Sequence, residues 1–187
     1  FLGMTHKEYR KMLVSLRKKI NVLETLMSAN RWGEIEFDKI PSKAGLIYKN
    51  AFARRDIIAR KYEEFAKSAD TKVNANTLYP YEIVAQACPY DKMYYDYTKR
   101  SYGFEALDAT DRAMINKYWE NLPDYLNGSE VSMMTVIDTS GSMTGRSASA
   151  PINTAIGLGI YCAERMSGPF AGHFISFSQH PQLINLE

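Results

Sequence analysis

The chain has 187 residues and a mass of 21.3 kDa, with 45% hydrophobic and 24% charged residues. This balance is typical of a folded domain and excludes disordered, collagen-like and disulfide-scaffold proteins. No apolar run reaches the roughly 18 residues that a membrane-spanning helix needs. The first residues show neither an initiator Met nor a signal-peptide layout, so we expect a piece of a longer protein and no membrane partner. Cys88 and Cys162 have no metal or redox spacing, which predicts reduced thiols and a cytoplasmic setting; a virus or phage origin fits equally.

Charge is divided unevenly along the chain. Residues 1–67 contain 15 Lys and Arg against 8 Asp and Glu, a net charge of +7. Residues 68–187 contain 8 against 13, a net charge of −5. Such a basic half indicates a surface that faces a polyanion. The alternative, that exposed helices carry cations only for solubility, stays open.

Amphipathic helices are predicted through residues 1–126. Thr5 and Glu8 form a capping-box pattern, and apolar residues then recur at spacings of three and four, which predicts one helix over residues 5–28. A second helical pattern begins near Ser42, the predicted cap, and runs through Arg54 and Arg55. Further helices are predicted at 81–87, 92–99 and 111–121, the last capped by Asp108 or Thr110, with a loop at 68–76. No segment before residue 130 alternates like a strand, so we expect an all-helical bundle or helical-repeat region.

The pattern changes at residue 131. Residues 131–137 are a continuous apolar run, which suits a strand buried on both faces. Residues 151–166 have a helical pattern in which Gly157 and Gly159 allow a close approach to the sheet, and residues 173–178 predict a second strand. Strand, helix and strand make one βαβ unit. Residues 127–187 are therefore predicted to be α/β, of the Rossmann-like kind.

Asp138, Ser140 and Ser142 follow the first predicted strand at a spacing of two residues. A tight loop can direct their oxygens to one point, and a carboxylate with hydroxyls suits Mg²⁺, and also Mn²⁺ or Ca²⁺. The alternative is that the three side chains only cap the turn and the following helix. Because ligands of open α/β sheets bind at the carboxyl ends of strands, the sequence predicts a metal site here.

A family resemblance rests on the same residues. Residues 138–143, Asp-Thr-Ser-Gly-Ser-Met, resemble the metal-ion-dependent adhesion motif (MIDAS) of von Willebrand factor A domains, and the resemblance covers residues 131–187. Upstream, residues 40–42, 48–52 and 78–82 are similar to TROVE-like helical regions, and more specifically to an uncharacterised family that joins such a region to an A-type domain. The best-known TROVE protein, the Ro autoantigen, is a helical-repeat ring closed by an A-type domain, and it binds small non-coding RNAs.

The resemblance implies a ribonucleoprotein with an incomplete A-type domain at residues 127–187. The family's metal site takes further ligands, a Thr and then an Asp, from later loops that lie beyond this sequence. We therefore expect a half-built site that need not hold its metal. A-type sheets also place further strands beside the first one, so we expect an apolar strand edge without a partner.

Binding is predicted in preference to catalysis. No His is spaced to pair with a nucleophile, and the glycine motifs of hydrolases and phosphate-binding loops are missing. In the first hypothesis, the basic helices contact RNA phosphates while Tyr94, Tyr95 and Tyr97 stack on unpaired bases. The predicted phosphate contacts are Lys7, Arg10, Lys11, Arg17, Lys18, Arg54 and Arg55. In the second, the metal loop or the helical array binds a protein partner as a scaffold. A solvated basic face, with tyrosines packed between helices, remains the alternative for these residues.

Overall fold

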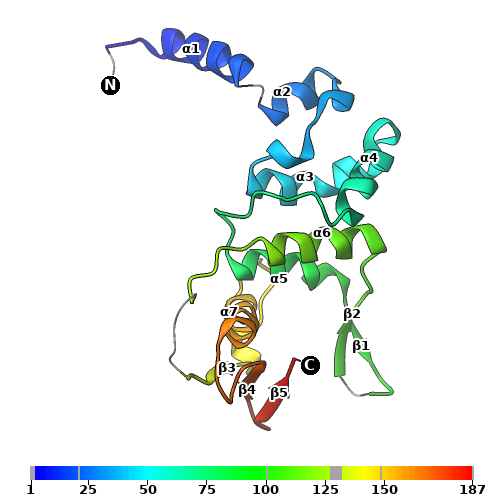
Figure 1. Ribbon diagram of the computed structural model, residues 1–187, viewed down its shortest axis with the longest axis vertical. Helices are drawn as coiled ribbons and strands as arrows, with labels where there is room; N and C mark the ends of the chain where they lie inside the picture. The colour runs from blue at the N-terminus through cyan, green and yellow to red at the C-terminus, as the bar shows by residue number, and fades with distance from the viewer. Residues whose placement is uncertain (1–2, 21, 100, 127–131, 148, 187) are drawn as a thin grey trace.

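The computed structural model describes residues 3–20, 22–99, 101–126, 132–147 and 149–186. It is elongated, with α1 at one end of the long axis and a small sheet at the other (Figure 1). The helices are α1 (His6–Lys19), α2 (Leu23–Ser28), α3 (Ser42–Arg54), α4 (Asp56–Lys67), α5 (Pro80–Ala87), α6 (Ala109–Glu120) and α7 (Pro151–Arg165). The strands are β1 (Met93–Asp96), β2 (Ser101–Phe104), β3 (Thr135–Asp138), β4 (His173–Phe177) and β5 (Gln182–Asn185). Short 3-10 turns are η1 (Trp32–Glu34), η2 (Phe37–Lys39), η3 (Tyr90–Lys92) and η4 (Gly141–Met143).

One main hydrophobic core lies among α2 to α6. Its centre is an aromatic cluster in which the rings of Phe37, Phe52 and Tyr62 meet with centroids 5.2 to 5.5 Å apart. Each such pair adds about 0.5–1.5 kcal/mol beyond the burial of its area. A largely buried ion pair joins α3 to α6, with Lys49 Nζ 3.1 Å from Asp111 Oδ2. The helical character predicted for this part of the chain is confirmed, except at the hairpin described below.

The predicted helix over residues 5–28 is interrupted. α1 ends with its C-cap at Ile20, and α2 begins after an extended Val22. Leu23 and Leu26 of α2 are buried in the main core, whereas α1 contains no buried residue. Because α1 ends at Lys19, α2 can take its own direction and place two leucines in the core, a favourable burial of apolar area.

The structure corrects one predicted helix cap and confirms another. Ser42 does not cap α3: Pro41 takes that place, and the buried Ser42 hydroxyl donates to Asn74 Oδ1 at 3.1 Å. Asp108 caps α6 as predicted, because its Oδ1 accepts from the backbone N–H of Asp111 at 2.7 Å.

Residues 92–99, predicted as a helix, instead begin an antiparallel hairpin. β1 and β2 pair with Tyr94 opposite Gly103 and Asp96 opposite Ser101. Asp96 starts the turn, and its Oδ1 accepts from the N–H groups of Thr98 at 2.9 Å and Lys99 at 3.1 Å. An aspartate that bonds the backbone two and three residues onward stabilises a turn, and tyrosines favour strands. The expectation that no strand precedes residue 130 was wrong for this reason.

The second half of the chain contains the predicted βαβ unit. β3 and β4 are parallel, α7 connects them, and β4 also pairs antiparallel with β5, a strand that the sequence did not predict. β3 begins only at Thr135, and the predicted start at Val131 lies outside the described residues. Ile137 packs under α7, but Val136 on the opposite face is 60% exposed. The strand is therefore buried on one face, not on both.

The sheet leaves one edge of its first strand without a partner among the described residues. β4 has a hydrogen-bonded neighbour on each side. Within the described ranges, the outer edge of β3 has no partner strand, as expected for the first strand.

α7 lies between the helical body, which comprises α2 to α6, and the sheet of β3, β4 and β5 (Figure 1). On one side, a Cβ at Gly159 would come within 3.0 Å of Ile137, so this glycine allows the close approach to the sheet that was predicted. A Cβ at Gly157 would instead lie 2.9 Å from the backbone of Pro80 and Tyr81, so this glycine serves the contact with α5. Tyr161, which donates from Oη to the carbonyl of Pro123 at 2.6 Å, belongs to the main core.

Candidate nucleic-acid interface and metal loop

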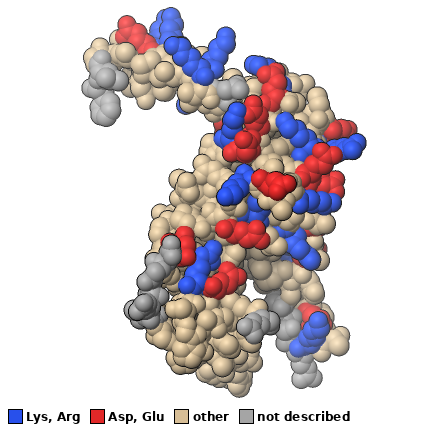
Figure 2. All heavy atoms as spheres, viewed as in Figure 1, with Lys and Arg blue, Asp and Glu red and all other residues tan. Residues whose placement is uncertain are grey.

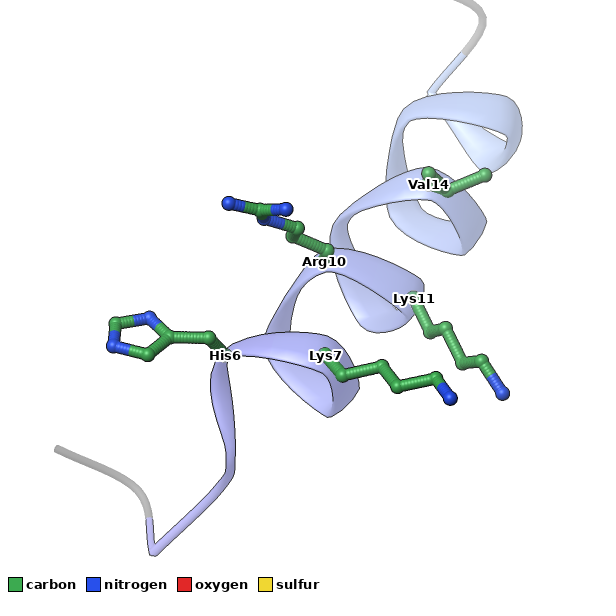
Figure 3. A pocket seen from close by; sticks show the side chains of 5 residues that line it. All are labelled: His6, Lys7, Arg10, Lys11 and Val14. Carbon is green, nitrogen blue, oxygen red and sulfur yellow. The ribbon is translucent and has the colours of Figure 1, made fainter.

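The five predicted phosphate contacts in residues 7–18 all lie on α1. Successive residues of an α-helix are about 100° apart, which places these five cations within an arc of about 120°. The opposite side of α1 carries an apolar stripe that includes Tyr9, Leu16 and Ile20, all exposed. His6, Lys7, Arg10, Lys11 and Val14 line a shallow hollow on this face. In Figure 3 the side chains of His6 and Arg10 point to one side of the helix and those of Lys7 and Lys11 to the other.

The cations of α1 are not neutralised within the described part of the chain. No ion pair joins Lys7, Arg10, Lys11, Arg17 or Lys18 to an acid among these residues. The acid of α1, Glu8, is committed to capping: its backbone and side-chain hydrogen bonds with Thr5 lower the pKa of Glu8. Figure 2 shows the result, a row of blue side chains along α1, whereas blue and red alternate over the rest of the helical body.

In the helical body most cations have partners. Ion pairs hold Arg31, Lys39, Lys43, Lys49, Arg60 and Lys67. Lys61 Nζ donates to the carbonyl of Ile35 at 2.7 Å, and the nearly buried Lys117 donates to carbonyl oxygens of Ser68 and Thr71. These cations are engaged within the fold, whereas α1 carries on one helix face five cations that are unpaired within the described ranges.

The last two predicted phosphate contacts lie elsewhere. Arg54 and Arg55 are exposed at the junction of α3 and α4. The guanidinium of Arg55 stands 4.9 Å from the ring centroid of Trp32, a cation–π contact that gives it a packing role. The structure therefore does not gather all seven predicted residues into one patch.

The predicted base-stacking tyrosines lie on the hairpin. Tyr94 and Tyr95 belong to β1, and Tyr97 stands in the turn. All three are exposed, and Tyr95 and Tyr97 meet edge to face with centroids 5.0 Å apart. The alternative that they pack between helices is wrong for these residues. At the base of the hairpin, the guanidinium of Arg146 lies 5.5 Å from the ring centroid of Tyr90, so the chain after the metal loop contacts the hairpin.

The structure brings the three residues of the predicted metal loop together at the end of β3. Asp138 Oδ1 accepts from the backbone N–H of Ser140 at 2.8 Å, and the hydroxyls of Ser140 and Ser142 are 3.1 Å apart. Thr139 anchors the loop to β4, since its N–H and its hydroxyl donate to the carbonyl of Phe177 at 2.8 and 3.2 Å. Hydrogen bonds from the side chain and then the backbone of Ser140 lower the pKa of Asp138, so the carboxylate is charged at neutral pH.

The donor set fits part of a divalent-cation shell. One carboxylate and two hydroxyls supply three of the roughly six oxygens that Mg²⁺ prefers, and Mg²⁺ commonly keeps several waters. Among the described residues no group of three or more His, Cys, Asp or Glu side chains could hold a metal. The loop therefore offers hard oxygens with a single negative charge. The same hydrogen bonds would also serve a turn without a metal, so the capping alternative stays open.

Comparisons with known proteins give families but no function. Residues 2–129 match a family model described as a domain of unknown function, DUF2828, and residues 132–187 match a second, DUF7788. Uncharacterized protein L728 of Acanthamoeba polyphaga mimivirus is 33% identical over 202 aligned residues, which cover 99% of this chain and 31% of the viral protein. No solved structure matches.

These matches carry neither a TROVE nor a von Willebrand factor A name, so both resemblances remain hypotheses. No helix among the described residues is long and apolar enough to cross a membrane. The DUF2828 match covers well over half of the sequence. The chain belongs to the DUF2828 family.

Proposed function

We propose that this protein binds RNA without catalysing a reaction, and that α1 makes the phosphate contacts. The observation that carries the proposal is the basic face of α1, whose cations have no acidic partner among the described residues. A helix with no buried residue contributes little to the core, so its composition is free to serve a partner. The resemblance to TROVE-like regions favours RNA as that partner, in a cytoplasmic ribonucleoprotein.

Phosphate contacts have a physical signature that other contacts lack. Each neutralised phosphate releases condensed counterions, so the affinity falls steeply as salt rises. A filter-binding titration with a polyuridine oligomer at low salt tests the proposal. We expect retention that weakens by orders of magnitude between about 50 and 200 mM salt. No retention at low salt would remove RNA binding as the function.

A second candidate function is a metal-bridged contact with a protein. It is supported by the convergence of Asp138, Ser140 and Ser142 at the carboxyl end of β3, as in the MIDAS motif. A bound Mg²⁺ would supply an open coordination position for a partner's carboxylate. This candidate function requires residues 127–187 to be the start of an A-type domain. The parallel β3–α7–β4 unit supports that requirement.

Calorimetric titration with Mn²⁺ tests the second candidate. We expect a heat of binding that disappears in Asp138→Ala, because the loop loses its carboxylate. The control is Asp124→Ala, which removes an acid outside the loop. If Asp138→Ala and the unchanged protein bind Mn²⁺ equally, the loop is only a turn, and the scaffold hypothesis must then rest on the helical array.

A further inference from the structure

We propose that the β1–β2 hairpin recognises unpaired bases by stacking them on Tyr94 and Tyr97, so that the partner is single-stranded RNA. This inference rests on the proposed RNA-binding function and adds the kind of RNA and the element that selects it. The hairpin pairs with no other strand among the described residues and projects from the body below α6 (Figure 1). Its aromatic rings therefore face solvent: Tyr94 is 49% exposed and Tyr97 is 85% exposed.

The ring of Tyr94 packs against Gly103 of the neighbouring strand. Gly103 lies opposite it on β2, and a Cβ there would come within 2.9 Å of both Cζ and Oη of Tyr94. The missing side chain thus lets the ring lie across the neighbouring strand while half of its surface stays open. A ring that is already held in place loses little conformational entropy when a base stacks on it.

Charges of both signs lie along the hairpin, and its cations can meet phosphates on either side of a stacked base. Lys92 and Lys99 flank β1, and Arg146 stands against Tyr90 at the hairpin's base. Of the acids, Asp96 is engaged by two backbone N–H groups of the turn and by Lys99. Glu105 follows β2 at the hairpin's base, where its backbone N–H donates to the carbonyl of Lys92. Sites for single-stranded nucleic acids combine such cations with aromatic rings, because every base has a face that can stack.

The same geometry argues against duplex RNA at this site. Bases in a duplex are stacked on each other, and the deep, narrow major groove of A-form RNA keeps side chains from their edges. The basic face of α1 makes no such distinction, since phosphates are present in both forms. The two elements lie at opposite ends of the molecule in Figure 1, so they can be altered independently.

The test measures filter binding of two RNAs. One is a single-stranded polyuridine oligomer, and the other is the duplex that this oligomer forms with polyadenosine. We expect Tyr94→Ala to weaken polyuridine binding about tenfold, the loss of one stacked base, and to leave the duplex and the salt dependence unchanged. Tyr94→Phe keeps the ring and should bind like the unchanged protein. Tyr125→Ala removes a tyrosine outside the hairpin that is 75% exposed, more than Tyr94, and should have no effect.

A second variant disturbs the contact between Gly103 and the Tyr94 ring without removing the ring. Gly103→Ala places a methyl group where the Tyr94 ring lies and should also weaken polyuridine binding, with circular dichroism confirming that the fold is kept. If Tyr94→Ala, Tyr97→Ala and Gly103→Ala all bind polyuridine normally while loss of the α1 cations abolishes binding, the hairpin proposal fails and RNA binding stands. If the unchanged protein retains neither RNA, both proposals fail. Tighter binding to the duplex than to polyuridine would also overturn the hairpin proposal.

Discussion

Replacing the five predicted α1 cations by glutamine gives the most direct test of how this protein meets a polyanion. Lys7, Arg10, Lys11, Arg17 and Lys18 have no ion pair within the described residues, and α1 buries no side chain. Glutamine keeps nearly the helix propensity of Lys and Arg, so the fold should be unaffected. The variant therefore isolates the charge of one helix face.

The expected magnitude follows from the number of cations. Each phosphate contact on a single strand contributes about 0.7 to the slope of log affinity against log salt, so five contacts contribute about 3.5. Between about 50 and 200 mM salt, a fourfold change, that slope corresponds to about a hundredfold loss of affinity. The variant should lack this loss, and filter binding of a polyuridine oligomer at several salt concentrations measures it.

A matched control removes equal charge from the helical body. Glutamine in place of cations that already have acidic partners should change the slope little; these are Arg31, Lys39, Lys43, Arg60 and Lys67. Equal slopes for the α1 variant and the unchanged protein would refute the assignment of phosphate contacts to α1. Equal changes in the variant and the control would show that only the net charge matters.

Three further predictions concern stability and pH. Lys49→Met leaves the largely buried Asp111 carboxylate without its partner, and urea unfolding should show a loss toward the lower end of about 3–5 kcal/mol. Gly157→Ala pushes a methyl group against the backbone of α5, and this overpacking should cost about 1–3 kcal/mol of unfolding free energy, more than the gain in helix propensity. Gly33→Ala is the control: its methyl group meets open space, so the protein should not be destabilised. Because the pKa of Asp138 is lowered from 3.8, any Mn²⁺ binding at the loop should be constant over about pH 5 to 8 and decline only in more acidic solution; a loss near pH 6 would implicate a histidine instead.

Local sequence signals predicted much of the fold correctly. Spacings of three and four found the helices, the Asp108 cap was placed correctly, and residues 131–178 gave the parallel strand–helix–strand unit. These signals succeed because each depends on neighbours within a few residues. The capping box of Thr5 and Glu8, with hydrogen bonds of 2.7 to 3.3 Å, is formed as expected for the same reason.

The errors arose where distant contacts decide the structure. The break after α1 depends on a core that Leu23 and Leu26 enter from far along the chain. The hairpin carried a readable signal, since Tyr94 and Tyr95 favour strands and Asp96 precedes turn residues, but the helical spacing of its neighbours outweighed it. β5 is a short strand with little pattern of its own, and its pairing with β4 shows only in three dimensions.

The candidate sites show the same division between local and distant information. Asp138, Ser140 and Ser142 converge because two-residue spacing and one backbone hydrogen bond are enough to bring them together. The seven basic residues share only a charge, and charge alone does not place residues on one surface. Five of them lie on one face because they belong to one helix, while Arg55 is drawn to the ring of Trp32. A metal loop can thus be predicted from a short motif, whereas a phosphate-binding face requires knowing which cations the fold has already paired.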